Sequence, residues 1–319
     1  MVPVNVKKLG IAAAALGMSF IAVVADAAPV KLQLRLQKGD RYNIQMVTDQ
    51  AVNQTILGRK QNTNQMVKIG YLFDVADVAT DGTTTVKMTY KSVQFKQSSP
   101  NGTVEYDSAR PATGNNPLAA SLGTLVGQSI SAKITPTGTV KEVQGIDQLI
   151  ARMISGMKIP NNAVKAQIES TLRSQFGEET FKELFSQSLD IYPAQPIDVG
   201  DSWSKKMTLS KGFPMTMETI YTLKSVKNNV ATVDITSKLK SNPNAPALQI
   251  SGASLKQNLA GIQKGSMQIQ LSTGMVTQSQ LNQDVSGNFQ VQGLPGASQA
   301  MSWPVSIKST VSINQIPLQ

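Results

Sequence analysis

The chain has no cysteine and no histidine among its 319 residues. Without cysteine it can form no disulfide, thiolate nucleophile, cysteine-ligated zinc site or iron–sulfur cluster, and without histidine it has no imidazole base or ligand. These absences remove much of enzyme chemistry, and we expect no catalytic residue, no bound metal and no cofactor. Hydrophobic residues make up 40% of the chain, which is enough for a substantial core.

Charged residues are also scarce. They make up only 16% of the chain, against about 25% in a typical soluble domain. The surface is therefore expected to consist mainly of amide and hydroxyl groups, as in Gln61–Gln65. The balance is basic, with 30 Lys and Arg, 20 Asp and Glu and a formal net charge of +10. This excess favours an anionic partner, such as a lipid or an anionic envelope component, or simply aids solubility.

Aromatic residues are rare as well, at 5% of the chain. After the N-terminal segment, the adjacent basic pairs are Arg59-Lys60 and Lys205-Lys206. Binding of single-stranded nucleic acid requires stacking aromatics beside a continuous basic surface. We therefore expect no nucleic-acid partner.

Residues 1–27 predict a secretory signal peptide. Lys7 and Lys8 precede the apolar run Leu9–Val24, and Ala25-Asp26-Ala27 supplies small residues of the kind that signal peptidase accepts. The run is shorter than the ~20 residues of a spanning helix, so we expect no stable membrane span after cleavage. The predicted location is the periplasm, the cell surface or the extracellular space.

Most of the remaining chain alternates apolar and polar residues, which is the period of a strand with one buried face. Leu32–Leu36 shows this pattern, and we expect a strand there. The turn Asp81-Gly82 predicts that Leu72–Val78 folds back on Thr83–Tyr90 as a hairpin. At Lys91-Ser92 the apolar positions change parity, which indicates a β-bulge.

The later part of the chain repeats the landmarks of the earlier part in the same order. The matched pairs are Gly39-Asp40-Arg41-Tyr42 with Gly200-Asp201-Ser202-Trp203, Asp81-Gly82 with Asn228-Asn229, Ser99-Pro100-Asn101 with Asn242-Pro243-Asn244, and Pro136-Thr137-Gly138 with Ser272-Thr273-Gly274. Such self-similarity indicates an internal duplication. The alternative is a plain antiparallel meander with ordinary turn residues.

Between the two repeated parts the apolar period becomes that of a helix. Ile146–Met157, Val164–Phe176 and Phe181–Leu189 each carry an apolar stripe, and Pro160-Asn161-Asn162 ends the first helix and caps the second. We therefore predict a β-rich α+β protein, in which two related antiparallel β halves form a curved sheet or half-barrel and a helical insert covers one face. The expected boundaries are 1–27 for the signal peptide, 28–145 for the first half, 146–192 for the insert and 193–319 for the second half.

The helical insert and the methionines together suggest a ligand site. The chain has 13 methionines, whose flexible thioethers suit either an adaptable apolar cavity or an ordinary core. If the insert lies across the concave face of the sheet, the space between them can hold an apolar or amphipathic ligand without catalysis. The residues expected to line this crevice are Ile150, Met153, Met157, Leu172, Phe176, Phe181 and Phe185.

Two other functions remain open. One is a structural envelope protein, or scaffold, without a small-molecule site. The other is a carboxylate-dependent polysaccharide hydrolase, for which Glu178, Glu179 and Glu183 form a cluster of acids. Lys182 lies among them, which is typical of a solvated helix surface, so this hypothesis is the least favoured.

Several turn and strand motifs are shared with a known family. They are Leu34-Arg35-Leu36-Gln37-Lys38-Gly39-Asp40, Ile134-Thr135-Pro136-Thr137-Gly138, Val143-Gln144-Gly145, Val199-Gly200-Asp201-Ser202-Trp203 and Gly212-Phe213-Pro214. In these the chain resembles an uncharacterised family of exported bacterial proteins, a domain of unknown function whose members are often lipoproteins. The resemblance spans essentially all of the chain after residue 27 and implies a common fold but no activity. The missing cysteine departs from the lipoprotein members.

Overall fold

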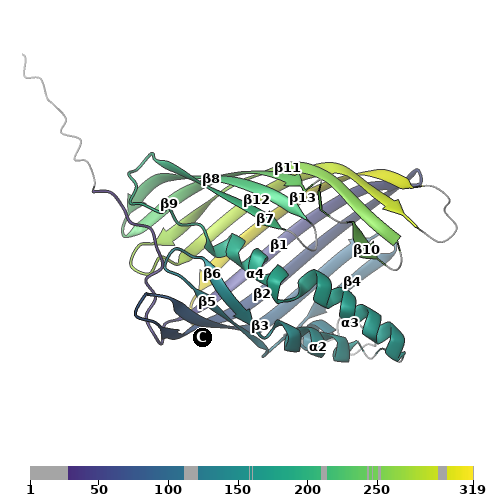
Figure 1. Ribbon diagram of the computed structural model, residues 1–319, viewed down its shortest axis with the longest axis horizontal. Coiled ribbons are helices and arrows are strands. Elements are labelled where there is room, and N and C mark those ends of the chain that lie inside the picture. Colours follow the sequence, from purple (N-terminus) through teal and green to yellow (C-terminus); the bar gives the residue numbers. More distant parts are fainter. Residues whose placement is uncertain are drawn as a thin grey trace, which may run out of the picture.

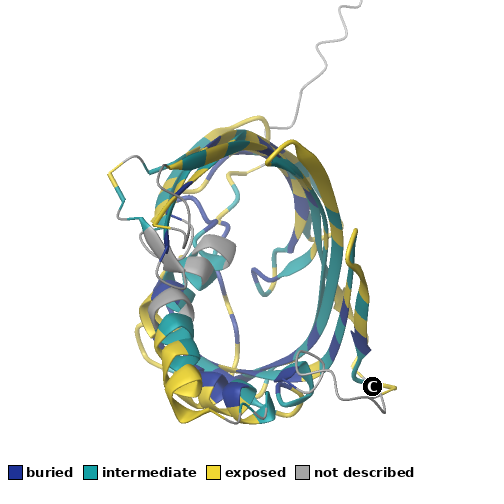
Figure 2. Ribbon diagram, turned by 90° about the vertical axis from the view of Figure 1, so that its right-hand side faces the viewer, coloured by how far each residue is buried: buried dark blue, intermediate teal, exposed yellow. Residues whose placement is uncertain are grey.

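The computed structural model describes residues 28–110, 121–157, 159, 161–209, 214–242, 244–245, 247–250, 253–293 and 300–318. Its strands form one antiparallel sheet that curves strongly (Figures 1 and 2). The strand order is β6-β5-β3-β2-β1-β13-β12-β11-β9-β8-β7, with β4 paired to β3 and β10 to β11. The prediction of a β-rich protein with a curved antiparallel sheet is therefore confirmed.

In the described part of the chain, thirteen strands form the sheet and three helices follow β6. The strands are β1 (Arg41–Ile56), β2 (Arg59–Val78), β3 (Thr84–Ser99), β4 (Gly102–Asp107), β5 (Ser129–Ile134), β6 (Val140–Gln144), β7 (Ser202–Leu209), β8 (Met215–Lys227), β9 (Val230–Ser241), β10 (Leu248–Ile250), β11 (Ala253–Gln270), β12 (Val276–Gln292) and β13 (Met301–Ile316). The helices are α2 (Ile146–Gly156), α3 (Asn162–Phe176) and α4 (Glu178–Leu189).

Residue parity decides which side chains face the concave interior, as β12 illustrates. Its inward positions include Leu281, Val285 and Val291, which are partly or fully buried. Its outward positions are Gln278, Gln280, Asn282, Asp284, Ser286, Asn288, Gln290 and Gln292, and all of them are exposed. Because alternate residues of a strand face opposite ways, this sequence gives the sheet an inner and an outer face of different chemistry.

The predicted hairpin and bulge are both present in the β2–β3 pair. Gly70 lies opposite Ser92 and Tyr71 lies opposite Tyr90, so Lys91 has no partner in this ladder. This one-residue insertion is the β-bulge that the change of parity predicted. A Cβ atom on Gly70 would lie 2.5 Å from Ser92 Oγ, so a side chain at this position would require the Ser92 hydroxyl to move.

Leu32–Leu36 is not a strand of the sheet, which corrects the sequence prediction. The three leucines are buried in the core, but the segment is not part of a β-ladder. It crosses the end of the sheet as a single segment. The Leu34 amide donates to Pro136 O (2.7 Å) and the Arg35 amide donates to Thr273 O (2.8 Å). The segment thus joins the β5–β6 turn to the β11–β12 turn. Alternating apolar residues indicate that one side of a segment is buried, but they do not indicate that the segment pairs with a neighbouring strand.

The helices connect the two edge strands, β6 and β7. Asn161 caps α3, because its side-chain oxygen accepts hydrogen bonds from Ala163 N (2.9 Å) and Val164 N (3.1 Å). The contacts of α4 include both edge strands, so it lies where the curved sheet is open (Figure 2). None of the described helices has the length and apolarity needed to cross a membrane. The predicted signal peptide, residues 1–27, lies outside the described residues.

Candidate functional site

An apolar cavity of about 450 Å³ lies between the concave face of the sheet and α4. Its volume is in the range of ~300–1,000 Å³ that is typical of small-molecule sites. Eight strands contribute to its wall, namely β1, β2, β3, β8, β9, β11, β12 and β13, and α4 contributes Phe181, Phe185 and Leu189. Strands from the first and the last parts of the chain therefore line the same cavity.

Five methionines line the cavity. They are Met46, Met88, Met217, Met267 and Met275. Unbranched thioether side chains change rotamer at low cost and follow the shape of an apolar ligand. The number of methionines in the sequence suggested an adaptable apolar cavity but did not show which of them would line it.

The C-terminal end of α4 is fixed over the cavity by hydrogen bonds to the sheet. Trp203 Nε1 donates to Ile191 O (2.8 Å), and the Tyr192 hydroxyl donates to Gly274 O (2.7 Å). Lys205 Nζ forms an ion pair with Asp190 (2.6 Å). These contacts come from β7 and from the β11–β12 turn, so both hold the helix against the opening of the sheet.

The β5–β6 turn packs closely against the same helix end. Gly138 has a φ of 87°, which favours glycine. A Cβ atom at this position would lie 1.7 Å from the Leu189 carbonyl oxygen. Only a residue without a side chain therefore allows the turn to approach α4 this closely.

Among the described residues that line the cavity, none is charged. Its polar residues are Tyr71, Tyr192 and Tyr221, together with Gln263, Ser279 and Gln283. Burial raises the pKa of Tyr221 to about 12, and the nearby Asp190 carboxylate adds to the shift. Burial also raises the pKa of Tyr71, beside Tyr90, and of Tyr192. The lining is therefore neutral at physiological pH.

The seven residues predicted to line the crevice are distributed more widely than expected. Phe181 and Phe185 line the cavity, with ring centroids 5.8 Å apart. Ile150 is buried in the main core, where Met153 and Leu172 pack against it. Met157 follows the end of α2, and the side chain of Phe176 is outside the described part of the chain. The apolar stripes of α2 and α3 indicated burial but not which element borders the cavity.

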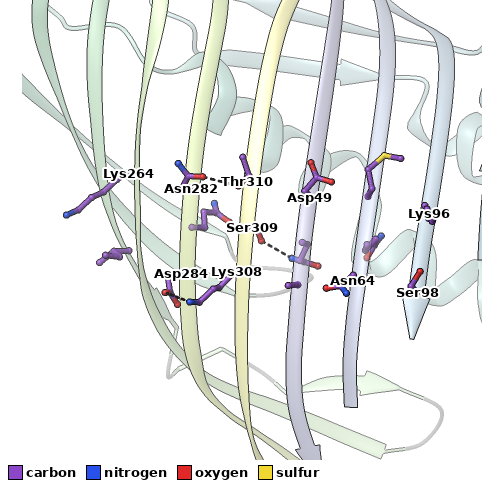
Figure 3. A pocket seen from close by; sticks show the side chains of 16 residues that line it. Asp49, Asn64, Lys96, Ser98, Lys264, Asn282, Asp284, Lys308, Ser309 and Thr310 are labelled. Carbon is purple, nitrogen blue, oxygen red and sulfur yellow. Dashed lines mark hydrogen bonds and ion pairs between the residues drawn. The ribbon is translucent and has the colours of Figure 1, made fainter. Parts of the chain in front are cut away.

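A second hollow, the outer groove, has a volume of about 720 Å³ and crosses β11, β12, β13, β1, β2 and β3 (Figure 3). Its outward side chains include Asp49, Lys96, Lys264, Asp284 and Lys308. Lys308 Nζ lies 3.8 Å from Asp284. The groove is thus a mixed-charge surface on the opposite face of strands that also border the cavity.

The acidic cluster on α4 does not border the cavity. Glu178 and Glu179 are exposed in the first turn of the helix, where negative charge is favourable. Within the described ranges, no three acidic side chains converge in a way that could hold a metal ion. The described residues of the cavity lining likewise offer Tyr, Gln and Ser oxygens but no carboxylate.

Residues 81–276 match a family of unknown function, DUF6263. The chain belongs to this family. The resemblance inferred from the turn and strand motifs, to an uncharacterised domain, is thereby confirmed. The matched range of this DUF6263 protein runs from the β2–β3 turn to the first residue of β12 and includes all three helices. No curated protein matches it.

Similar solved structures are distant in sequence. A structure of lipovitellin, concerned with lipid–protein interactions, has 10% identity and a TM-score of 0.48, covering 89% of this chain and 26% of its own. An outer membrane channel from Pseudomonas putida F1 has 10% identity and a TM-score of 0.24, covering 89% and 97%. OccK7 from Pseudomonas aeruginosa has 6% identity and a TM-score of 0.22, covering 89% and 100%. The DUF6263 chain thus spans about a quarter of the lipovitellin chain.

Proposed function

We propose that this DUF6263 protein is a non-catalytic envelope protein that binds an apolar or amphipathic ligand of the lipid class in the cavity beneath α4. The observation that supports this most is the neutral lining, in which five methionines and α4 aromatics surround about 450 Å³. Transfer of one methylene group from water to such a site contributes about 0.8 kcal/mol. An acyl or isoprenoid chain therefore gains affinity with each buried carbon.

The proposed architecture is a duplicated meander whose two halves are joined by the helices. The order β1-β2-β3-β5-β6 recurs as β7-β8-β9-β11-β12. Asp40 Oδ2 accepts from Gln37 N (2.8 Å), and Asp201 Oδ2 accepts from Asp198 N (2.9 Å). Gly39 N donates to Val75 O (2.9 Å) as Gly200 N donates to Leu223 O (2.7 Å). This matched geometry supports two related halves that enclose the cavity together.

Two register shifts add to this comparison. The β2–β3 ladder shifts between Val75 and Asp77, and the β8–β9 ladder shifts between Leu223 and Ser225. Each shift follows the residue that bonds to the Gly-Asp turn. A bulge at the same place in both meanders supports duplication over a chance succession of hairpins.

The proposed site of action is the bacterial envelope or the exterior. The features that support export are Lys7, Lys8, the apolar run Leu9–Val24 and the small residues up to Ala27. A carrier of apolar molecules is needed where such molecules cross an aqueous space. The scaffold alternative requires a filled interior, which the cavity disfavours. The hydrolase alternative requires convergent acids, whereas Glu178 and Glu179 are exposed away from the lining.

The test is a pair of tryptophan variants on β12. Leu281→Trp fills the cavity, whereas Gln280→Trp places the same side chain on the outer face. We expect Leu281→Trp to lower the affinity for a fluorescent acyl probe at least tenfold and Gln280→Trp to leave it unchanged. Denaturant unfolding of both variants verifies the fold, because overpacking costs only about 1–3 kcal/mol.

The same protein, purified from its own cells without detergent, is examined by native mass spectrometry. The proposal expects a bound species of lipid mass that organic extraction removes. Absence of an extractable lipid together with absence of probe uptake by the delipidated protein contradicts it.

A further inference from the structure

A row of polar side chains crosses the inner face of the sheet, perpendicular to the strands. It is centred on Thr219, Ser237, Gln263, Gln283, Ser309 and Gln50, which lie on β8, β9, β11, β12, β13 and β1. In the register of the sheet, each of these residues is directly opposite the next one named. Thr219 is opposite Ser237 at one end of the row, and Ser309 is opposite Gln50 at the other. The register extends the row to Lys205 on β7 and to Gln65 and Gln97 on β2 and β3. We call this set the polar row.

Apolar residues flank the polar row on both sides. The next inward positions toward the main core include Tyr221, Ile235, Leu281 and Val311. On the other side lie Met217, Leu239, Val285, Ile307 and Val52. The row is therefore a polar band within an apolar surface and not the edge where the interior meets solvent.

The members of the row form hydrogen bonds along it. Gln283 Nε2 donates to Gln263 Oε1 (2.5 Å), and Gln263 Nε2 donates to Ser237 Oγ (3.3 Å). The Ser237 and Thr219 hydroxyls are 2.9 Å apart, and Gln50 Nε2 donates to Ser309 Oγ (3.2 Å). Thr219, Ser237, Gln263 and Ser309 are all buried. Burying polar groups in an apolar surface is unfavourable unless they are paired, and these four residues are paired along the row.

The cavity reaches the polar row at Gln263 and Gln283. Within the described residues, Gln283 Oε1 accepts no hydrogen bond, and its Nε2 has a second hydrogen beyond the one given to Gln263. The Gln283 side-chain amide can therefore accept one hydrogen bond from a molecule in the cavity and donate one to it. A ligand hydroxyl or amide can satisfy both, because each can donate and accept.

Charge along the row restricts the ligand further. Lys205 is the charged member, and Asp190 pairs with it at 2.6 Å. Within the described part of the chain, neither the row nor the cavity lining presents an unpaired cation to a phosphate or carboxylate. Burying such an anion without a partner is strongly unfavourable.

We infer that the ligand is an amphipathic lipid with an uncharged, hydroxyl- or amide-bearing head, which Gln263 and Gln283 bind while its apolar chain occupies the cavity. This inference rests on the proposed function and adds the chemical class of the head group. Gln283 is the contact that distinguishes a neutral polar head from a plain hydrocarbon. The described residues of the row and of the lining offer no unpaired cation, which distinguishes it from an anionic lipid.

The test compares ligands of matched acyl chain in displacement of a fluorescent acyl probe. The ligands are monoolein with a neutral diol head, oleate and oleoyl lysophosphatidate with anionic heads, and an alkene of equal chain length. We expect monoolein to bind about tenfold more tightly than the other three, the effect of one to two net hydrogen bonds. Comparable affinities for monoolein and the alkene, or tighter binding of either anion, overturn the inference but leave the proposed function standing.

Variants on β12 and β11 assign the effect to the polar row. Gln283→Leu and Gln263→Leu are each expected to weaken monoolein binding about tenfold and to leave alkene binding within about twofold. Gln280→Leu, on the outer face of the same strand, is the matched control and should change neither. An unchanged preference for monoolein in both inner variants, with unfolding midpoints near that of the wild type, also overturns the inference. If neither probe nor ligand binds the wild type, the proposed function itself fails.

Discussion

The two faces of the central strands differ in chemistry at the same level of the sheet. On β12, the side chain of Gln283 is half-buried on the inner face beside apolar neighbours, whereas the side chains of Asn282 and Asp284, directly before and after it, are exposed in the outer groove (Figure 3). The inner face has neutral polar groups within an apolar surface, and the outer groove carries Asp49, Lys96, Lys264, Asp284 and Lys308. A one-residue step along the chain thus separates a charged surface from an uncharged cavity.

This difference assigns separate roles to the two faces. Charges on the outer face remain solvated, so they interact weakly with one another and influence encounter with other molecules. Groups on the inner face are desolvated, so each hydrogen bond or charge there has a large effect on which ligand fits. The variants and conditions below should have large effects on the inner face and small ones on the outer face.

The largest effect is expected at alkaline pH. All six tyrosines have a pKa raised above the ordinary value by burial, and that of Tyr221 rises from 10.0 to about 12. The folded state holds the neutral phenol more tightly than the unfolded state does. The contribution of the buried tyrosines to the free energy of unfolding is complete below pH ~10 and is lost as the pH rises toward 12. The shift of Tyr221 alone corresponds to about 3 kcal/mol.

Tyrosinate absorbance and circular dichroism, recorded in one pH titration, check this prediction. Ionisation of the tyrosines should coincide with unfolding and should not precede it. Tyr221→Phe should lose less stability between pH 10 and 12 than the wild type. Six tyrosines that ionise near pH 10 in a folded protein would contradict the described burial.

A charge placed on the inner face is the next largest change. Met267 is 3% exposed and lines the cavity, and Gln268 is exposed on the outer face. Met267→Lys should lower the free energy of unfolding by about 3 kcal/mol, because the ammonium has no partner in the lining. Gln268→Lys should change it by less than about 0.5 kcal/mol. Urea unfolding measures both, and equal effects would mean that the two faces do not differ as described.

The smallest effect is expected for an ion pair of the outer groove. The Lys308 and Asp284 side chains are 67% and 56% exposed. Solvent screens such a pair, so Lys308→Ala should alter the free energy of unfolding by less than about 0.5 kcal/mol. A loss several times larger in thermal or urea unfolding would show that the outer charges stabilise the sheet.

Local sequence patterns were sufficient for several parts of this fold. Alternation identified the inward residues of the strands, and the change of parity located the bulge at Lys91. The turn at Asp81-Gly82 and the cap at Asn161 were also predicted from residues that favour a single local geometry. These features depend on neighbours in the chain, which explains why the sequence alone indicates them.

The cavity and the polar row depend on contacts between distant residues. Gln50 and Ser309 are 259 positions apart, and only the β1–β13 register brings them together. The helical stripes predicted Phe181 and Phe185 at the cavity, which they line, but also Met153 and Met157, which are not among its lining residues. Leu32–Leu36 alternates as a strand does but ties two turns together. In each case the local pattern fits more than one arrangement, and tertiary packing determines which of them forms.

Photolabelling tests the central claim most directly, because it asks which face holds the ligand. The purified protein is irradiated with a neutral diazirine-bearing acylglycerol, and the labelled peptides are identified by mass spectrometry. We expect labels on inward residues around the cavity, such as Phe185, Met267 and Leu281, that excess monoolein removes. Labels confined to the outer groove near Asp49 and Lys308, or labels that monoolein does not reduce, would contradict it.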